Sequence, residues 1–288
     1  MPVIAVVNRK GGSGKSTLAT HLASYCAGQG MNVMLGDADS QQSTHSWLRR
    51  REAQNLASVT KIVGWVADLK NVLRAPPGVT HVVLDTPGGL RGFDLVRVVM
   101  VADAILMPVC NSVFDRESAA ACFEELRAHP RVASGRCKVA AVGMRLDART
   151  KADEVLRQWA AGHGITYLGV LRETQTYVRC LERGLSLFDM PPAKAEADLE
   201  QWQPIIEWIK PVLQVPVRGT PAARRPTRPV LAPGSVPSQT QPAPLESVAS
   251  RLKPAPAADT PDRPFGLSAR LGRWFESVTL RRARSPGR

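Results

Sequence analysis

The sequence predicts an α/β fold in which a mostly parallel, twisted sheet is flanked by helices and followed by a disordered C-terminal extension. Two observations support the sheet. Short apolar runs such as VIAVV and HVVLD have the composition of buried strands, and they alternate with longer helical patterns, as parallel strands joined by helices do. A third observation supports the extension, because 14 of the 23 prolines lie in residues 211–288.

The predicted elements alternate regularly along the first 210 residues. Strands are predicted from short, mostly apolar runs at 3–7, 32–37, 59–63, 81–85, 104–109, 138–144 and 166–171. The run at 59–63 is expected at an edge of the sheet. Helices are predicted between or after these strands, at 15–29, 43–54, 66–74, 93–102, 114–128, 151–162, 174–183 and 194–210. Crossovers of this kind cover both faces of a sheet with helices.

Charge divides the chain in the same way. Of the net charge of +13, residues 1–210 carry 25 basic and 21 acidic side chains, whereas residues 211–288 carry 13 and 4. A basic, Pro-rich segment buries too little apolar surface to offset the entropy lost on ordering. We therefore expect a globular domain at 1–210, a disordered linker at 211–263 and a basic amphipathic segment at 264–288.

A glycine-rich loop, RKGGSGKST at 9–17, lies between the first predicted strand and the first predicted helix. Glycines let backbone N–H groups surround phosphate oxygens, and a helix N-terminus adds partial positive charge. In such a P-loop, Lys15 reaches the β- and γ-phosphates, Ser16 ligates Mg²⁺ and Thr17 lies beside the α-phosphate. Arg9 stands where the strict pattern has glycine, so this loop is a variant. The other loop residues predicted to contact nucleotide are Gly11, Gly12, Ser13 and Gly14.

Three carboxylates end two other predicted strands. Asp37 and Asp39 close the second strand, and Asp85 ends the run HVVLD. Because the carboxyl ends of parallel strands meet at one edge of the sheet, these side chains are expected near the loop. Asp85 fits the Walker B role of holding Mg²⁺. Asp37 or Asp39 could orient the attacking water, although an acidic pair after a strand is also common in simple turns.

Other classes of protein lack support in the sequence. The five cysteines show no C-x-x-C spacing, which argues against a zinc site. Thr17 occupies the position of the third glycine in G-x-G-x-x-G, so a dinucleotide-binding fold is disfavoured. Lys15 stands where a G-x-S-x-G motif around Ser13 would need glycine. No apolar run approaches the roughly 18 residues of a membrane span.

Together these motifs resemble the ParA/MinD family of ATPases. KGGSGKST resembles the deviant Walker A motif of that family, DADSQ resembles its A′ motif, and VVLDTPG resembles its Walker B motif. The segments at 107–119 and 143–151 are similar to ParA segments in the same order. The resemblance covers about residues 2–210 and implies a P-loop NTPase fold with ATP and Mg²⁺ as cofactors.

The resemblance also implies a role for the second lysine of the loop. In this family the first lysine, here Lys10, contacts the nucleotide phosphates of the facing subunit, so that ATP is sandwiched in a homodimer. A cation supplied in this way stabilises charge that develops in the transition state, as an arginine finger does. The alternative for Lys10 is an ordinary solvated loop charge.

The remaining site residues are assigned by the same resemblance. Asp39 is expected to position the hydrolytic water, which makes the predicted catalytic residues Lys10, Lys15 and Asp39. The predicted surroundings of Mg²⁺ are Ser16, Asp37 and Asp85. Met144 and Arg145 fall where adenine-side contacts of the family tend to lie. Ser40 replaces the proline that usually follows the second aspartate of the A′ motif.

The resemblance implies a slow ATPase whose ATP-bound dimer binds a polyanionic matrix and positions or partitions a cargo. A partner protein then stimulates hydrolysis and releases the dimer. For ParA-like members the matrix is non-specific DNA, which implies a cytoplasmic, nucleoid-associated protein. Candidate contacts, which could equally be a solvated face, are Arg172, Arg179, Arg183, Lys194 and Lys210. The segment PVCNSVFD is closer to orphan members that place protein cargo.

The main alternative is a MinD-like regulator that binds a membrane surface. Within 264–288, a basic segment has apolar residues at helical spacing, namely Leu267, Leu271, Trp274, Phe275 and Val278. This segment suits an interfacial helix, a docking peptide for a protein partner, or a disordered tail that only adds charge. Two further classes are disfavoured, because a metal-cluster carrier would need C-x-x-C and a metabolic P-loop enzyme would lack Lys10.

Overall fold

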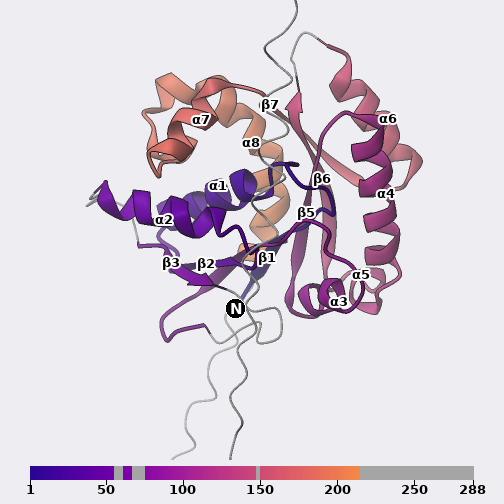
Figure 1. Ribbon diagram of the computed structural model, residues 1–288, viewed down its shortest axis with the longest axis horizontal. Helices are drawn as coiled ribbons and strands as arrows, with labels where there is room; N and C mark the ends of the chain where they lie inside the picture. The colour runs from indigo at the N-terminus through magenta and orange to yellow at the C-terminus, as the bar shows by residue number, and fades with distance from the viewer. Residues whose placement is uncertain (55–60, 67–74, 147–149, 215–288) are drawn as a thin grey trace, which may run out of the picture. The chain divides into compact units, whose positions relative to one another are not determined.

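The computed structural model describes residues 1–54, 61–66, 75–146 and 150–214 (Figure 1). Its sheet has seven strands in the order β3-β2-β4-β1-β5-β6-β7. Every pairing between neighbouring strands is parallel, so the predicted α/β fold with a parallel sheet is confirmed. The strands are β1 Val3–Val6, β2 Val33–Asp37, β3 Val63–Val66, β4 His81–Asp85, β5 Ala104–Val109, β6 Lys138–Leu146 and β7 Thr166–Arg172.

Helices cover both faces of the sheet, and each face has its own apolar core (Figure 1). One face carries α1 Lys15–Gly28, α2 Ser43–Ala53, α7 Gln175–Glu182, the 3₁₀ helix η2 Leu187–Asp189 and α8 Pro192–Leu213. The other carries α3 Gly92–Val101, α4 Val113–Arg127, α5 Pro130–Ala133 and α6 Ala152–Gly162. None of the helices in these ranges combines the length and the apolarity that a bilayer span requires.

The region around β3 differs from the prediction. The edge strand expected at 59–63 begins at Val63 and ends at Val66, where a helix at 66–74 was expected. Close packing accounts for the glycine in this strand, because a Cβ on Gly64 would lie 2.8 Å from Leu48 Cδ1 of α2. The remainder of that predicted helix, 67–74, lies outside the described residues.

The C-terminal helix also differs in its bounds. Helix α8 was expected at 194–210 but runs from Pro192 to Leu213, with Pro204 and Pro211 inside it. Pro192 suits the first turn, where a missing N–H costs nothing. The helix thus continues past the predicted domain boundary at 210. Because residues 215–288 lie outside the described part of the chain, the linker and the amphipathic segment stay predictions.

A buried ion pair fixes α2 against the segment that follows α7. Arg51 Nη2 lies 2.7 Å from Asp189 Oδ1, and Arg51 Nη1 donates to the Gly184 carbonyl at 3.2 Å. Burial alone would raise the pKa of Asp189, but hydrogen bonds from Arg51 and Ser186 outweigh it and hold this pKa below its usual range. The pair keeps α2 in place beside the carboxyl end of β2, where the predicted site begins.

An aromatic cluster joins α1 to α7 and α8. The His21 ring stacks on Trp202 with 5.6 Å between ring centroids, and it lies 5.0 Å from the Tyr177 ring. Burial lowers the pKa of His21 to about 4, so the ring is neutral at physiological pH. The Trp202 indole N–H donates to the Tyr177 hydroxyl at 2.9 Å.

Tyr177→Phe is expected to lower the free energy of unfolding by roughly 1–3 kcal/mol, because the buried Trp202 N–H then loses its acceptor. Urea unfolding without nucleotide measures the change. Tyr25→Phe is the matched control, since no described residue hydrogen-bonds the Tyr25 hydroxyl, and it should shift stability by no more than about 0.5 kcal/mol. Equal effects of the two variants would contradict a special role for the Tyr177 hydroxyl.

Candidate functional site

The glycine-rich loop leads from β1 into α1 at the carboxyl end of the sheet. Gly12 and Gly14 have φ values of 75° and 94°, a region that residues with a Cβ rarely adopt. A Cβ on Gly14 would also lie 2.7 Å from Met144 Cε. Gly14 is the N-cap of α1, and no described side chain caps this helix. The first N–H groups of α1 are therefore available to phosphate oxygens.

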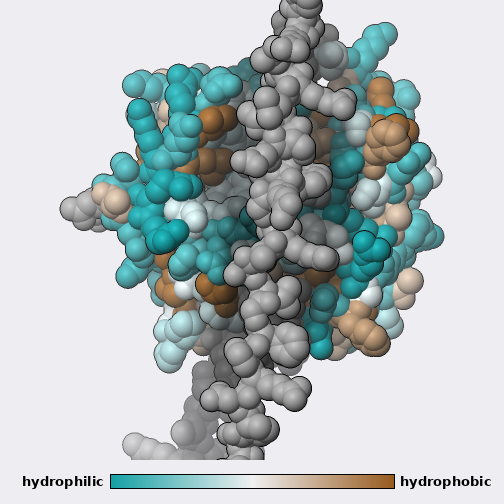
Figure 2. All heavy atoms as spheres, in the orientation of Figure 1, coloured by the Kyte–Doolittle hydropathy of each residue, from teal (hydrophilic) through white to brown (hydrophobic). Residues whose placement is uncertain are grey.

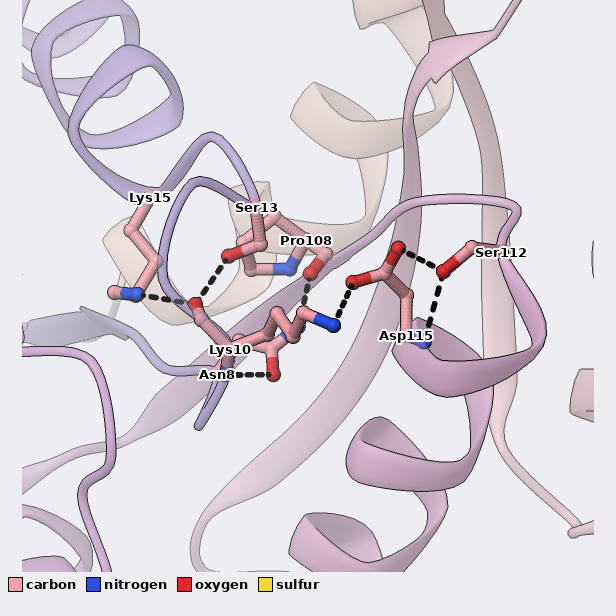
Figure 3. Close-up of polar contacts among 7 residues, drawn as sticks. All are labelled: Asn8, Lys10, Ser13, Lys15, Pro108, Ser112 and Asp115. Atoms are coloured by element: carbon pink, nitrogen blue, oxygen red, sulfur yellow. Dashed lines mark hydrogen bonds and ion pairs between the residues drawn. The ribbon is translucent and has the colours of Figure 1, made fainter. Parts of the chain in front are cut away.

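Lys15 begins α1 and turns its amine back into the loop (Figure 3). Its Nζ donates to the Lys10 carbonyl at 2.9 Å, and Ser13 Oγ donates to the same oxygen at 3.3 Å. Burial lowers the pKa of the Lys15 amine, although the charges of Asp85 and Asp39 oppose this shift. A buried cation thus bonds a neutral carbonyl here, and a phosphate oxygen would be a stronger acceptor for it.

Asp85 ends β4 directly beneath the loop. It is fully buried, and neither carboxylate oxygen has a hydrogen-bond partner among the described residues. Burial raises the pKa of Asp85 to about 7; the nearby Ser16 hydroxyl opposes this shift, although it forms no hydrogen bond of normal geometry with Asp85. Two orphaned carboxylate oxygens beside a serine hydroxyl fit a magnesium ion, which prefers oxygen ligands. When bound, Mg²⁺ would neutralise phosphate charge at this position.

The structure gives different surroundings to the two aspartates at the carboxyl end of β2. The Asp37 carboxylate is buried and accepts four hydrogen bonds, one from the Asp39 N–H and three from the first turn of α2, including Thr44 Oγ1 at 2.7 Å. Asp37 therefore anchors α2, and its place near Mg²⁺ stays a prediction. Asp39 is half-buried, and among the described residues its Oδ1 accepts only the Gln41 N–H, at 3.0 Å. Of the two, Asp39 has more free acceptor capacity for a water molecule.

A pocket of about 320 Å³ opens beside the loop between β6, β7 and α7. Met144 and Arg145, the residues predicted on the adenine side, line it together with Thr17. Arg145 has a φ of 56°, and the register between β6 and β7 is irregular there. Sequence reasoning missed the opposite wall, Glu173, Thr174, Tyr177, Val178 and Leu181. The rule that ligands gather at the carboxyl ends of parallel strands, applied to β7, would have indicated it.

Lys10 lies on the same loop as Lys15, but its amine points toward Asp115 and away from the Lys15 amine (Figure 3). Lys10 Nζ is 3.7 Å from Asp115 Oδ1 on α4, and 43% of its side chain is exposed. The amine also lies 5.9 Å from the centroid of the Phe114 ring. The structure thus brings Lys15, Ser16 and Asp85 together and leaves the Lys10 amine outside that group.

Arg9, the residue that departs from the strict motif, connects the loop to two helices. Its guanidinium pairs with Glu125 of α4. The other oxygen of Glu125 accepts the Gly92 N–H at the start of α3, at 2.7 Å. The sequence pattern contains no signal for Glu125, because it lies 116 positions from Arg9 and only the fold brings the two together.

A glycine loop that leads into a helix N-terminus, a buried lysine and a strand-end aspartate together define a P-loop nucleotide-binding protein. A family model described as CobQ/CobB/MinD/ParA nucleotide binding domain matches residues 4–187. The chain belongs to this family, which confirms the ParA/MinD resemblance of its motifs.

Two relatives agree with this assignment, and a solved structure shares the fold. The chain is 39% identical over 116 residues to maintenance of carboxysome distribution protein A from Gloeobacter kilaueensis, a match that spans 39% of this chain and 51% of that protein. It is 26% identical over 189 residues to the protein of the same name from Halothiobacillus neapolitanus, covering 65% and 87%. A McdA–ATP complex from Cyanothece superposes with a TM-score of 0.56 at 15% identity, over 71% and 96% of the two chains, and shows a shared fold.

Proposed function

We propose that this chain is a ParA-type ATPase that binds Mg²⁺-ATP and forms a dimer with ATP between its two copies. The observation that carries the proposal is a loop with two lysines in different roles. Lys15 is buried beside Asp85, where a phosphate and its metal would lie. Lys10 carries an amine that extends from the loop and is partly exposed, so a second copy can reach it.

Each residue of this site has its own role in ATP hydrolysis. Lys15 and the N-terminus of α1 bind the phosphates, and Ser16 and Asp85 hold Mg²⁺. Asp39 orients the attacking water, for which it has free acceptor capacity. Lys10 of each copy then stabilises charge on the nucleotide bound by the other copy. Hydrolysis removes the γ-phosphate that joins the copies, and the dimer separates.

Non-specific DNA is the proposed matrix for the ATP-bound dimer. Three of the candidate cations, Arg179, Arg183 and Lys194, line one pocket of about 370 Å³, and no acidic side chain is among its described lining residues. Hydrophilic side chains also gather over α7 and α2 in Figure 2. Arg172 is a weaker candidate because its Nε lies 2.6 Å from Asp198 Oδ1. Phosphate contacts of this kind make binding fall steeply with salt.

The proposed cargo is a protein assembly, which an adaptor protein links to the ATPase and whose binding stimulates hydrolysis. This part rests on the names of the two relatives, which are maintenance of carboxysome distribution proteins. The corresponding location is the cytoplasm, on the nucleoid. The alternative hypothesis, a MinD-like membrane regulator, rests on residues 264–288, which lie outside the described part of the chain.

Asp39→Ala provides the test. With Mg²⁺-ATP it is expected to hydrolyse at least about a hundredfold more slowly, and to give a light-scattering mass near twice that of the 31.2 kDa chain. Lys10→Ala should bind ATP and remain monomeric. Asp39→Ala that binds ATP but stays monomeric would refute the sandwich dimer.

The trapped dimer also identifies the matrix. It should co-sediment with a random-sequence DNA duplex at low salt. The double variant that combines Arg179→Glu and Arg183→Glu should lose this DNA binding and still form the dimer. Arg127→Glu with Arg136→Glu, which changes two exposed arginines remote from that pocket, is the charge-matched control. Binding to anionic liposomes that depends on residues 215–288, without binding to DNA, would favour the membrane regulator instead.

A further inference from the structure

The resting position of Lys10 is built from several contacts. Its amine lies 3.7 Å from Asp115 Oδ1 and 5.9 Å from the centroid of the Phe114 ring. The Asp115 side chain is only 14% exposed, so this ion pair is less screened by water than a fully exposed one. A carboxylate and an aromatic face both attract an ammonium group. We call these two residues the Lys10 seat.

The carboxylate of the seat is held in orientation by the N-terminus of α4. Ser112 Oγ donates to Asp115 Oδ2, while the Asp115 N–H donates to Ser112 Oγ at 3.1 Å (Figure 3). Asp115 Oδ1 is therefore left for Lys10. A negative charge in the first turn of a helix is also stabilised by the helix dipole.

The backbone of Lys10 is fixed relative to the seat. The Lys10 N–H donates to Asn8 Oδ1 at 3.1 Å, and Asn8 Nδ2 donates to the Pro108 carbonyl of β5 at 2.5 Å. The turn that begins α4 follows β5 directly. The loop and the seat are thus positioned by the same strand, and only the Lys10 side chain has to move for the amine to leave.

We propose that Asp115 is a positioning residue that keeps the Lys10 amine on its own subunit until a nucleotide-loaded second copy competes for it. This inference rests on the proposed function, in which Lys10 acts on the nucleotide of the facing copy. One amine cannot bond Asp115 and a phosphate of another subunit at the same time. Leaving the seat therefore opposes dimerisation, and Asp115 sets how much ATP-loaded protein is needed before the dimer forms.

Asp115→Asn tests the proposal while keeping an acceptor for Ser112. Each ion pair is worth up to about fivefold in an equilibrium constant, and both copies give one up. The dissociation constant of the ATP-bound dimer, measured by sedimentation in an Asp39→Ala background, should fall on the order of tenfold. Glu117→Gln removes the same charge from an exposed position of the same helix and should leave the dissociation constant unchanged. Asp115→Glu, which restores a carboxylate, should return the dissociation constant toward the parent value.

A second measurement on the nucleotide-free protein is independent of dimerisation. Loss of the Asp115 charge removes the ion pair that holds the Lys10 amine and leaves the amine more accessible. An amine-reactive succinimidyl ester should therefore modify Lys10 at least about twofold faster in Asp115→Asn, as peptide mass spectrometry would show. Unchanged labelling of Lys10, or a weaker dimer in Asp115→Asn, would contradict the proposed role of the Lys10 seat. Faster labelling in Asp115→Asn, without an ATP-dependent dimer in that variant or in the parent, would instead refute the proposed function. The Lys10 seat would still be supported.

Discussion

Lys15→Ala is expected to raise the dissociation constant for Mg²⁺-ATP at least about a hundredfold, which corresponds to ~2.7 kcal/mol. The reason is that Lys15 is the buried cation of the loop, and its charge-assisted bonds to phosphate oxygens have no substitute in an alanine variant. Isothermal titration calorimetry with ATP and Mg²⁺ measures the loss.

The second lysine of the loop provides the matched control for this experiment. Lys10→Ala removes the same side chain five positions away, where the amine points at Asp115 and away from the Lys15 amine. At protein concentrations that keep the chain monomeric, its affinity for ATP should stay within about threefold of the parent value. If Lys15→Ala retained affinity while Lys10→Ala lost it, the two roles would have to be exchanged.

Asp85→Asn is expected to stabilise the nucleotide-free protein while it removes magnesium-dependent activity. The folded carboxyl has a pKa of about 7, compared with a reference value of 3.8. Protonation of the folded state therefore contributes stability that is complete below pH 3.8 and is lost as the pH rises through 7. Asparagine does not titrate, so the variant keeps its stability as the pH rises. At pH 8 its free energy of unfolding should exceed that of the parent by roughly 4 kcal/mol.

The pH dependence of this difference distinguishes it from a general packing effect. Urea unfolding without Mg²⁺ or nucleotide should show the advantage of Asp85→Asn growing by roughly 3 kcal/mol between pH 5 and pH 8. Asp94→Asn, an exposed position on α3, should show a difference below about 0.5 kcal/mol at both pH values. An advantage of Asp85→Asn that shrinks with rising pH would contradict a raised pKa at Asp85.

The regular elements were largely predictable because each depends on short stretches of chain. The strands at 81–85 and 104–109 have the predicted bounds, since their apolar runs end abruptly at polar or turn residues. β3 was misplaced because its four residues are half-buried or exposed, so burial imposes no clear apolar pattern on the sequence there. The helix α5 and the 3₁₀ helix η2 were missed, as they are too short to show a hydrophobic period.

The candidate site was predictable where sequence neighbours build it and unpredictable where distant segments meet. The loop and the position of Asp85 follow from a strand, a glycine turn and a helix start in succession. Asp37 and Asp39 look equivalent in sequence, but α2 supplies three donors to the former, whereas the latter accepts one bond from its own turn. Which carboxylate remains free therefore depends on the packing of a separate helix.

The sequence by itself determined the class of fold, the glycine-rich loop between β1 and α1 and the presence of two lysines in that loop. These follow from local backbone preferences and from the period of apolar residues. Only the tertiary structure decided where the two amines point, because their partners come from other parts of the chain. Lys15 is directed inward by burial beside Asp85, and Lys10 is held by Asp115 across a gap of 105 positions in sequence.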